Sequence, residues 1–478
     1  MADVGPSAHG TDTTAEAAVA APAAGQHEGG EVRVDPNEPV NVVYVGFKGL
    51  KRVSPHSLIV ECRALGNART LGGVSRALQD AQGRLTQLNL FKSLRADVSL
   101  EHTGVVDVSF VVEERGRECT VSANVDKKGE VSCDLRLTQP ALLGGPLSAM
   151  GSIGSTASQA HEFLLRLSTP RFLGRRAAWS FDLARSSSDE REASSYSERV
   201  THAVMKLSDS AGVHSVFAEA AIRDLYPATD APRLASAEVQ QAQLRSVKTS
   251  LRYTFLWSSQ WLRAAAPGLG ASLRNDFEVA GLLGDVRFVR NEASASACLP
   301  LPWNLLWHLS GSCGAIFPTG GRPTCLQDRF FLGGASGSST VFKGFAHRGL
   351  GPVGLCKVRD PEKPAKHLTD ALGSDCMCNA FAAVSAPVLI PQGPSGGVIE
   401  GRAFGFLGFG ALAPRPCTGA AALLRSLQEG ARASVGLGVG MPLAGMGNLE
   451  LTFAHPFWAH RHDIRQQWQL GLRLEMRG

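Results

Sequence analysis

The sequence predicts an all-β transmembrane barrel of about sixteen antiparallel strands, preceded by one small α+β domain of β-α-α-β-β order. Three observations favour this fold class. The apolar residues change from a helical period to a period of two near Cys119, about sixteen alternating segments follow, and no stretch approaches the ~18 consecutive apolar residues of a membrane helix. We expect a disordered acidic, Ala-rich tail at 1–40, the small domain at 41–117 and the barrel at 118–478.

Composition and charge narrow the function classes. The chain of 478 residues is 44% hydrophobic, which is enough for a large core. Seven acidic residues against Arg33 give the tail a net charge of −6, and since the whole chain carries +5, the remainder carries +11. A basic body suits anionic lipid headgroups. The Lys and Arg residues are scattered singly rather than clustered, which argues against a nucleic-acid partner.

The small domain is predicted from helix signals and apolar spacing. Residues 42–45 are a strand candidate, and Ser54-Pro55 begins a helix that runs to about Leu65. Two further strands are expected at 94–101 and 105–113. A second helix has apolar residues three and four apart, at Val74, Leu78, Ala81, Leu85 and Leu88. We expect this helix to pack on the sheet face that carries Val43 and Val45.

The barrel region is predicted from strict alternation. Trp179 and Phe181 alternate with Ser180 and Asp182, and the same pattern recurs to the end of the chain, with one face apolar and the other accepting charge. A soluble β-sandwich can alternate too. The number and length of the segments favour a membrane barrel with its apolar side chains outward. No helix is expected between the strands.

One connection is too long for an ordinary turn. About sixty residues, near 319–378, separate a strand near 305–316 from a strand near 379–388. The first half of this loop carries paired aromatic residues around cations and glycines, at Arg329, Phe330, Gly333, Gly334, Lys343, Gly344 and Phe345. Such a segment is too apolar for open water. We expect it to fold into the barrel lumen, with Lys343 facing polar residues and Gly344 letting the backbone approach the wall.

These residues resemble a known superfamily. The 41–117 segment resembles a polypeptide-transport-associated (POTRA) domain, including the step into its second strand at 88–93. The segments at 329–334 and 343–345, with Gly351-Pro352, resemble the loop motif of the bacterial surface antigen barrel of outer-membrane protein insertases. Within that superfamily, the single such domain and the turn at 141–144 are most similar to the barrel subunits of the mitochondrial sorting and assembly machinery.

The resemblance implies a function. Members insert client β-barrel precursors into the mitochondrial outer membrane through a seam between the first and last strands, without nucleotide hydrolysis. It implies client precursors, companion subunits and membrane lipids as partners, a POTRA-like domain in the intermembrane space, no enzymatic activity and no cofactor. The family usually has arginine where this chain has Lys343. The acidic partners expected near Ser385 and Gly408 are not evident, and Glu400 or Asp182 are the candidate substitutes.

The closing strand carries a second resemblance. The family's client sorting signal has a polar residue, a glycine and two hydrophobic residues at a fixed spacing. The last strand has a similar pattern at Gln469, Gly471, Leu474 and Met476. An ordinary last strand gives the same alternation, so both interpretations stay open. The strand must pair with the first strand, near 120–125, because an open edge in lipid leaves backbone groups unsatisfied. We expect this pairing to be weak, because Gly471 adds no side chain.

Two other classes of function are weighed against the insertase. One is a polypeptide-conducting channel of a plastid outer envelope, and the other is a soluble all-β binding module.

The glycine-rich stretches at 405–410 and 436–440 match neither a dinucleotide nor a phosphate-loop pattern. The segment at 460–462 has two histidines without further metal ligands at a suitable spacing, and we interpret it as a solvated turn.

Overall fold

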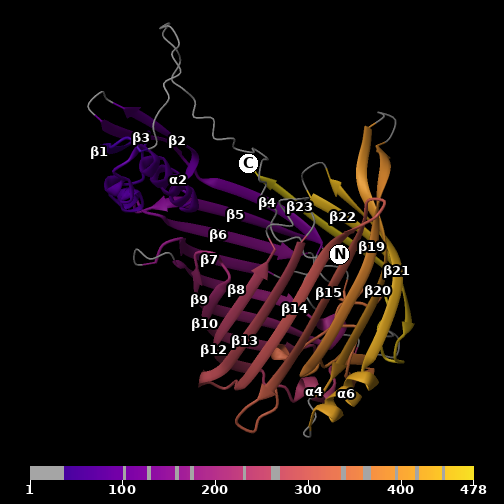
Figure 1. Cartoon of the computed structure of the whole chain (residues 1–478). Coiled ribbons are helices and arrows are strands. Elements are labelled where there is room, and N and C mark those ends of the chain that lie inside the picture. Colours follow the sequence, from indigo (N-terminus) through magenta and orange to yellow (C-terminus); the bar gives the residue numbers. More distant parts are fainter. Residues whose placement is uncertain are drawn as a thin grey trace. The chain divides into compact units, whose positions relative to one another are not determined.

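The protein forms two compact units, shown in Figure 1. The small unit holds the described residues up to Gly116 together with Pro140–Leu147, and the large unit holds the remainder. This computed structural model describes residues 37–100, 104–125, 131–156, 161–172, 177–229, 233–259, 270–334, 341–358, 368–392, 397–414, 419–443 and 447–477. Residues 1–36 of the tail predicted at 1–40 therefore lie outside the described residues, whereas Val40 is buried in the core of the small unit, so the tail is shorter than predicted.

The small unit is an α+β domain with a three-stranded sheet. Its elements are β1 (Asn41–Lys48), α1 (Pro55–Ile59), α2 (Leu71–Gln87), β2 (Phe91–Leu100) and β3 (Val105–Glu114), with 3-10 turns at Val60–Cys62 and Leu65–Asn67. The strand order is β1-β3-β2, with β1 parallel to β3 and β2 antiparallel to it. This order is consistent with the predicted POTRA-like domain. Thr70 caps α2 by accepting a hydrogen bond from the Gly73 N–H, which satisfies a donor of the first helical turn.

Helix α2 packs on the sheet as predicted, but the residues of β1 that face it differ from the predicted ones. Leu85 and Leu88 are buried, as expected. Val43 is exposed, and the core is completed instead by Val42, Val45 and Phe47. The register between β1 and β3 shifts between Val42 and Tyr44, and this irregularity turns Val43 away from the core. The prediction that Val43 faces α2 was therefore wrong.

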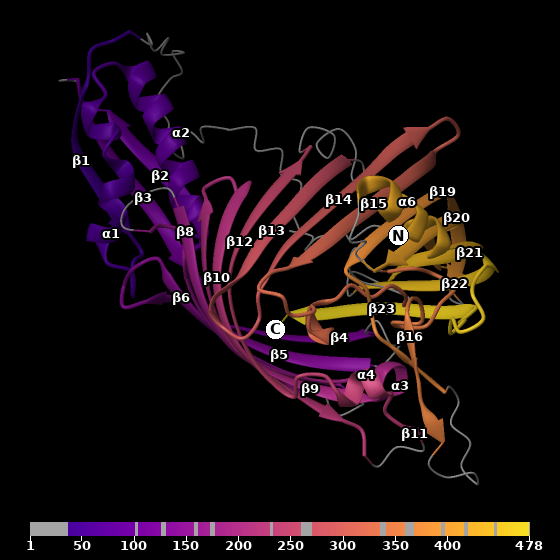
Figure 2. The same ribbon diagram turned by 90° about the horizontal axis from the view of Figure 1, so that it is seen from below.

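The large unit is a closed barrel of sixteen antiparallel strands within the described residues (Figures 1 and 2). In chain order the strands are β4 (Glu118–Val125), β5 (Val131–Leu142), β6 (Leu147–Thr156), β7 (His161–Thr169), β8 (Ala177–Asp189), β9 (Tyr196–Asp209), β10 (His214–Pro227), β12 (Arg245–Ser258), β13 (Gly270–Gly284), β14 (Phe288–Leu301), β15 (Leu305–Pro318), β19 (Cys376–Gln392), β20 (Gly397–Ala413), β21 (Ala431–Leu443), β22 (Gly447–Trp458) and β23 (Trp468–Arg477). Each strand pairs with the next along the chain, and β23 closes on β4. The predicted strand number and fold class are confirmed.

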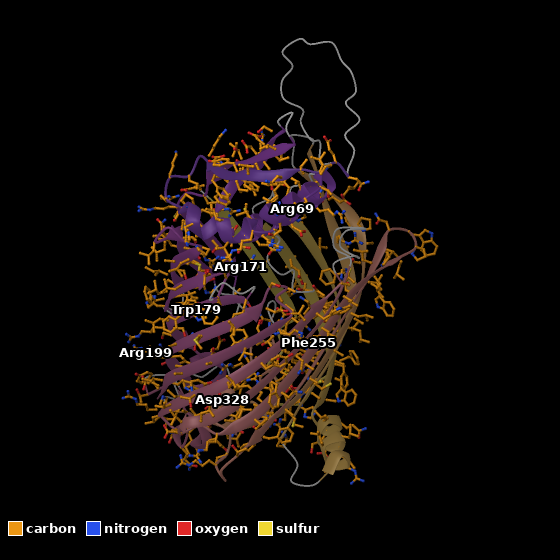
Figure 3. All side chains as sticks on the ribbon, turned by 60° about the vertical axis from the view of Figure 1, so that its left-hand side comes forward. Arg69, Arg171, Trp179, Arg199, Phe255 and Asp328 are labelled. Atoms are coloured by element: carbon orange, nitrogen blue, oxygen red, sulfur yellow. The ribbon has the colours of Figure 1, made fainter. Side chains whose placement is uncertain are left out.

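Alternate side chains face opposite sides of the wall. On β15, Trp307 and Phe317 are exposed outward, while His308 and Ile316 are buried. At ~3.3 Å per residue and a strand tilt of ~40°, the two aromatic residues lie roughly 25 Å apart along the barrel axis. This distance is the height of an apolar membrane band. At the outer margin in Figure 3, Arg199 stacks on Tyr226 with 5.8 Å from the guanidinium carbon to the ring centroid. No helix of the described residues is long and apolar enough to span a membrane.

The connections between barrel strands contain short elements that the alternating pattern did not predict. They are α3 (Arg191–Ser194), α4 (Ala237–Gln240), α6 (Gly419–Glu429), and two small ladders that pair β11 (Arg233–Leu234) with β17 (Lys357–Val358) and β16 (Val353–Leu355) with β18 (Thr369–Ala371). The expectation of no helix between the strands was wrong. Alternation reports the strands but carries no signal for short helices in the turns between them.

The long connection between β15 and β19 folds into the barrel. Its first half lies against the inner face of the wall. Phe330, Leu332, Phe342 and Phe345 are almost fully buried, in one cluster with inward-facing wall residues such as Ile316. An apolar loop of this length is stable in a lumen because the wall removes its aromatic side chains from water.

Candidate functional site

Lys343 is held by a carboxylate on the wall. Its side chain is 3% exposed, and Nζ lies 2.5 Å from Oε1 of Glu450 on the lumenal face of β22. A buried ammonium needs such a partner, because taking a lone charge out of water costs several kcal/mol. The carboxylate neutralises Lys343 and fixes the loop to the second-last strand.

The predicted substitutes for this acid do not serve that role. Asp182 accepts two 2.7 Å hydrogen bonds from Arg166 on the neighbouring strand, and Glu400 is exposed near the start of β20. Ser385 binds His308 and Arg402 instead. Both candidate substitutes were therefore wrong. The acid comes from β22, three strands beyond β19 in the barrel, so it is distant from the loop in sequence.

The backbone on either side of Lys343 is also bonded to the last strands. Ser434 on β21 donates a 2.7 Å hydrogen bond to the Lys343 carbonyl. The buried amide of Gln469 on β23 accepts from the Gly344 N–H at 3.1 Å and donates to the Phe345 carbonyl at 2.8 Å. A side-chain amide can satisfy a donor and an acceptor together, which a carboxylate or an ammonium cannot. The tip of the loop thus contacts β21, β22 and β23.

The loop continues as a partner of the segment that leads into β23. The N–H of Gln466 donates to the Gly344 carbonyl at 3.0 Å, and the N–H of Ala346 donates to the Ile464 carbonyl at 2.9 Å. Phe345 and Arg465 form an antiparallel bridge at the same place. The backbone groups of the loop tip are therefore paired like those of a short extra strand.

Gly344 fits its position for two reasons. Its φ is +94°, a conformation that L side chains rarely adopt. A Cβ there would also lie 3.2 Å from that of Ala454 and 3.4 Å from that of Ser434. The predicted close approach of Gly344 to the wall is present. The flanking rings of Phe342 and Phe345 stack on each other, with centroids 5.3 Å apart.

The first half of the motif packs elsewhere in the lumen. The Phe330 ring lies under the Arg290 guanidinium at 4.3 Å, and the Phe330 backbone exchanges two hydrogen bonds with Ser374. Arg329 Nη1 donates to the Leu372 carbonyl at 3.2 Å. Gly333 and Gly334 have φ of +127° and +103°, and the Gly334 N–H donates to the Phe345 carbonyl. The two halves of the predicted motif are therefore brought together.

Two charged clusters in the lumen were not predicted. Arg223 on β10 makes a bidentate pair with Asp328 at 2.8 and 3.0 Å, and Lys248 on β12 lies 2.7 Å from Glu278. Asp328, labelled near the lower end of the barrel in Figure 3, directly precedes the predicted Arg329. An acid inside this apolar loop was the available signal, because a buried carboxylate implies a cation nearby.

The second cluster lies just beyond the loop tip. Arg348 Nη1 donates to the Tyr196 hydroxyl at 2.6 Å, and its guanidinium stacks on Phe331 at 4.2 Å. Burial disfavours the charged form, but Tyr196 and Glu190 outweigh it and raise the pKa of Arg348, so the guanidinium stays charged. The loop is thus fixed to β9, at the other side of the lumen from β21–β23, as well as to the last strands.

The closing ladder is short. Among the described residues, the pairs between β23 and β4 run from Arg473↔Asn124 to Arg477↔Thr120, five residues of each strand, whereas seven join β22 to β23 and ten join β20 to β21. Leu474 and Met476 lie in this ladder, opposite Ala123 and Val121.

Of the predicted closing-strand residues, Gln469 and Gly471 lie outside this ladder. Gly471 pairs with Glu450 of β22, so the reason given for a weak seam was wrong. Within the part of the chain that the structure describes, the pairs of β4 reach along β23 as far as Arg473. Gln469 is held by the loop instead.

The fold and the site define a class of protein: a membrane-embedded β-barrel with a lumenal loop fastened to its last strands and an α+β domain before its first strand. A family model described as the Omp85 superfamily domain matches residues 115–475. The chain belongs to the Omp85 superfamily.

Individual relatives agree with this assignment. The chain is 26% identical over 445 residues to the sorting and assembly machinery component 50 homolog of Bos taurus, which covers 89% of this chain and 88% of the relative. The homolog of Homo sapiens is 26% identical over 446 residues, with the same coverage. Among solved structures, BamA from Haemophilus ducreyi lacking POTRA domains 1–3 has a TM-score of 0.69 at 16% identity, covering 91% of this chain and 85% of that one. CdiB from Acinetobacter baumannii has a TM-score of 0.53 at 12% identity, covering 92% and 74%. These structural likenesses concern the fold.

Proposed function

We propose that this chain inserts and assembles β-barrel proteins in the mitochondrial outer membrane, through a lateral seam between β4 and β23. The full-length similarity to sorting and assembly machinery components supports the membrane and the client class. The single observation that supports the seam is the closing ladder, which has five pairs among the described residues and is shorter than the ladders of seven and ten that precede it. Fewer backbone hydrogen bonds must break there than at those neighbouring positions.

The site gives the loop a defined part in this function. Client strands enter by pairing with an exposed backbone edge, so the barrel must part at one place while the rest of the wall stays closed. Lys343, Gly344 and Phe345 are bonded to Ser434, Glu450 and Gln469 on the three strands before the seam. The loop therefore supports those strands from inside when β23 separates from β4.

The partners follow from this function. They are client β-barrel precursors, companion subunits of an assembly complex and the lipids around the wall. The POTRA-like domain lies in the intermembrane space, and insertion proceeds without nucleotide hydrolysis or a cofactor. Strand pairing supplies the driving force, because each backbone group paired in lipid avoids a cost of several kcal/mol.

Depletion of the chain distinguishes this function from its alternative. If the protein is an insertase, the steady-state levels of other outer-membrane barrels fall, while helically anchored outer-membrane proteins, the matched control, keep theirs. Unchanged barrel levels would reject the insertase. A polypeptide-conducting channel of a plastid outer envelope, the alternative, predicts instead that precursors of interior proteins accumulate outside the organelle.

A further inference from the structure

The helix α6 lies at the rim of the barrel and has no role in the proposed function. It fills the connection between β20, which ends at Ala413, and β21, which begins at Ala431. The helix packs against β20, and Figure 1 shows it beside the ends of these strands. Eleven residues give it about three turns.

The burial of β20 shows which face of the wall the helix covers. Leu407 and Phe409 face outward, with 53% and 39% of their surfaces exposed. Ala411 and Ala413 continue the same alternation on the same strand, yet they are 1% and 0% exposed. Ala431, at the start of β21, pairs with Ala411 and is equally buried. The helix therefore lies on the outer, membrane-facing side of the wall, directly beyond the apolar band.

The surface of α6 has three sectors. Leu423, Ser426 and Leu427 are half-buried and mark the side toward the wall. Successive residues turn by about 100°, so Leu424 extends the leucine side away from the wall, whereas Arg425 and Glu429 lie on the opposite flank. Leu424 is 62% exposed, and the two charged residues are exposed too. Wall contacts therefore leave one apolar flank and one polar flank uncovered.

We propose that α6 is an interfacial membrane helix, whose uncovered leucine flank inserts into the lipid bilayer beside the barrel while Arg425 and Glu429 face the headgroups and water. Lipid covers this flank because the flank continues the outward-facing apolar band of Leu407 and Phe409. The barrel itself places that band against acyl chains. An apolar face beside a polar one, lying along the membrane plane, is the arrangement by which short helices bind at the headgroup boundary. The inference needs only that the barrel crosses a membrane, so it stands or falls separately from the insertase.

The test uses the full-length protein in phosphatidylcholine nanodiscs. A photoreactive benzoylphenylalanine replaces Leu424 in one sample and Arg425, the neighbouring position on the polar flank, in another. Illumination is expected to give a phosphatidylcholine adduct at position 424 several times more often than at position 425, measured by mass spectrometry. Equal adduct yields, or none at position 424, would overturn the proposal. A cross-link from position 424 to a second copy of the chain would overturn it in favour of a protein partner.

A second measurement separates lipid insertion from packing. Leu424→Glu is expected to speed amide hydrogen exchange within α6 by roughly tenfold in nanodiscs. The variant loses the free energy that the leucine side chain gains on transfer from water to lipid. Arg425→Gln, on the polar flank, should leave the exchange unchanged. Because Leu424 is exposed within the protein, packing alone predicts equal exchange in both variants, and that result would contradict the proposal.

Discussion

At the residue scale, the pair of Lys343 and Glu450 makes the sharpest prediction. Lys343→Ala leaves Glu450 desolvated without a partner, and we expect a loss on the order of 3 kcal/mol, the low end for a broken buried pair because Glu450 keeps 22% exposure. Lys343→Arg should be tolerated, because it restores a cation. Thermal shifts of the detergent-solubilised barrel would measure both.

A double-mutant cycle controls for the loop's other contacts. If the pair acts as a unit, Lys343→Ala combined with Glu450→Ala should be less destabilised than the sum of the single variants. Simple additivity, or a Lys343→Ala barrel that melts like the parent, would show that the ion pair is not the anchor of the loop.

Glu114 in the small unit gives a pH-dependent prediction. Its carboxylate accepts hydrogen bonds from the N–H groups of Lys51, Arg52 and Val53 at 2.8, 2.9 and 2.9 Å. Burial pushes its pKa up, but these hydrogen bonds outweigh burial and hold the pKa below the usual 4.5. A lowered folded pKa means stabilisation that is fully present above pH 4.5 and is lost as the pH falls through the folded pKa.

Hydrogen exchange in the full-length protein tests this. At pH 7, Glu114→Gln should speed exchange at residues 51–53, after correction for intrinsic rates, and the difference from the parent should shrink as the pH falls below 4.5. Glu113→Gln, on the exposed neighbour, should have no effect. A pH-independent difference would mean that the amide contacts, not the charge, carry the stabilisation.

At the element scale, the ladder between β4 and β23 is the one that must open. Ala123→Cys with Leu474→Cys places a pair of thiols across it. Oxidation of this pair should block insertion of a client barrel into isolated membranes, and a reductant should restore it. The matched pair Leu451→Cys with Leu470→Cys crosses the next ladder and should leave insertion intact. If both disulfides had equal effects, the barrel would open at another ladder or would not open at all.

The elements themselves differ in how far local sequence predicts them. Alternation predicted the strands β15 and β19 because an outward side chain must be apolar in lipid. The start of β1 was predicted, but not the irregularity that turns Val43 outward, because that depends on pairing with β3. Helix α6 was missed because alternation carries no signal for a helix in a connection between strands.

At the scale of the whole molecule, strand parity fixes which connections share a side of the membrane. With sixteen antiparallel strands, β4 begins and β23 ends on one side, while α6 follows an odd-numbered strand of the barrel and lies on the other. We expect the protein to resist carbonate extraction. A protease site inserted beside α6 should be cut on intact mitochondria, and the domain at 41–117 only after the outer membrane is ruptured. Cleavage of the domain on intact organelles would reverse the orientation.

The sequence by itself determined the fold class, the α+β domain, the long loop and the loop motif at 329–334 and 343–345, because period, turn residues and an apolar loop are local properties. Only the tertiary structure decided what Lys343 and Gln469 do. Glu450 and Gln469 lie more than a hundred residues beyond Lys343 and Gly344, and the folding of the barrel brings them together. A buried charge implies a partner of opposite charge. Which residue serves as that partner depends on the register of the strands around the wall, and closure of the whole sheet sets this register.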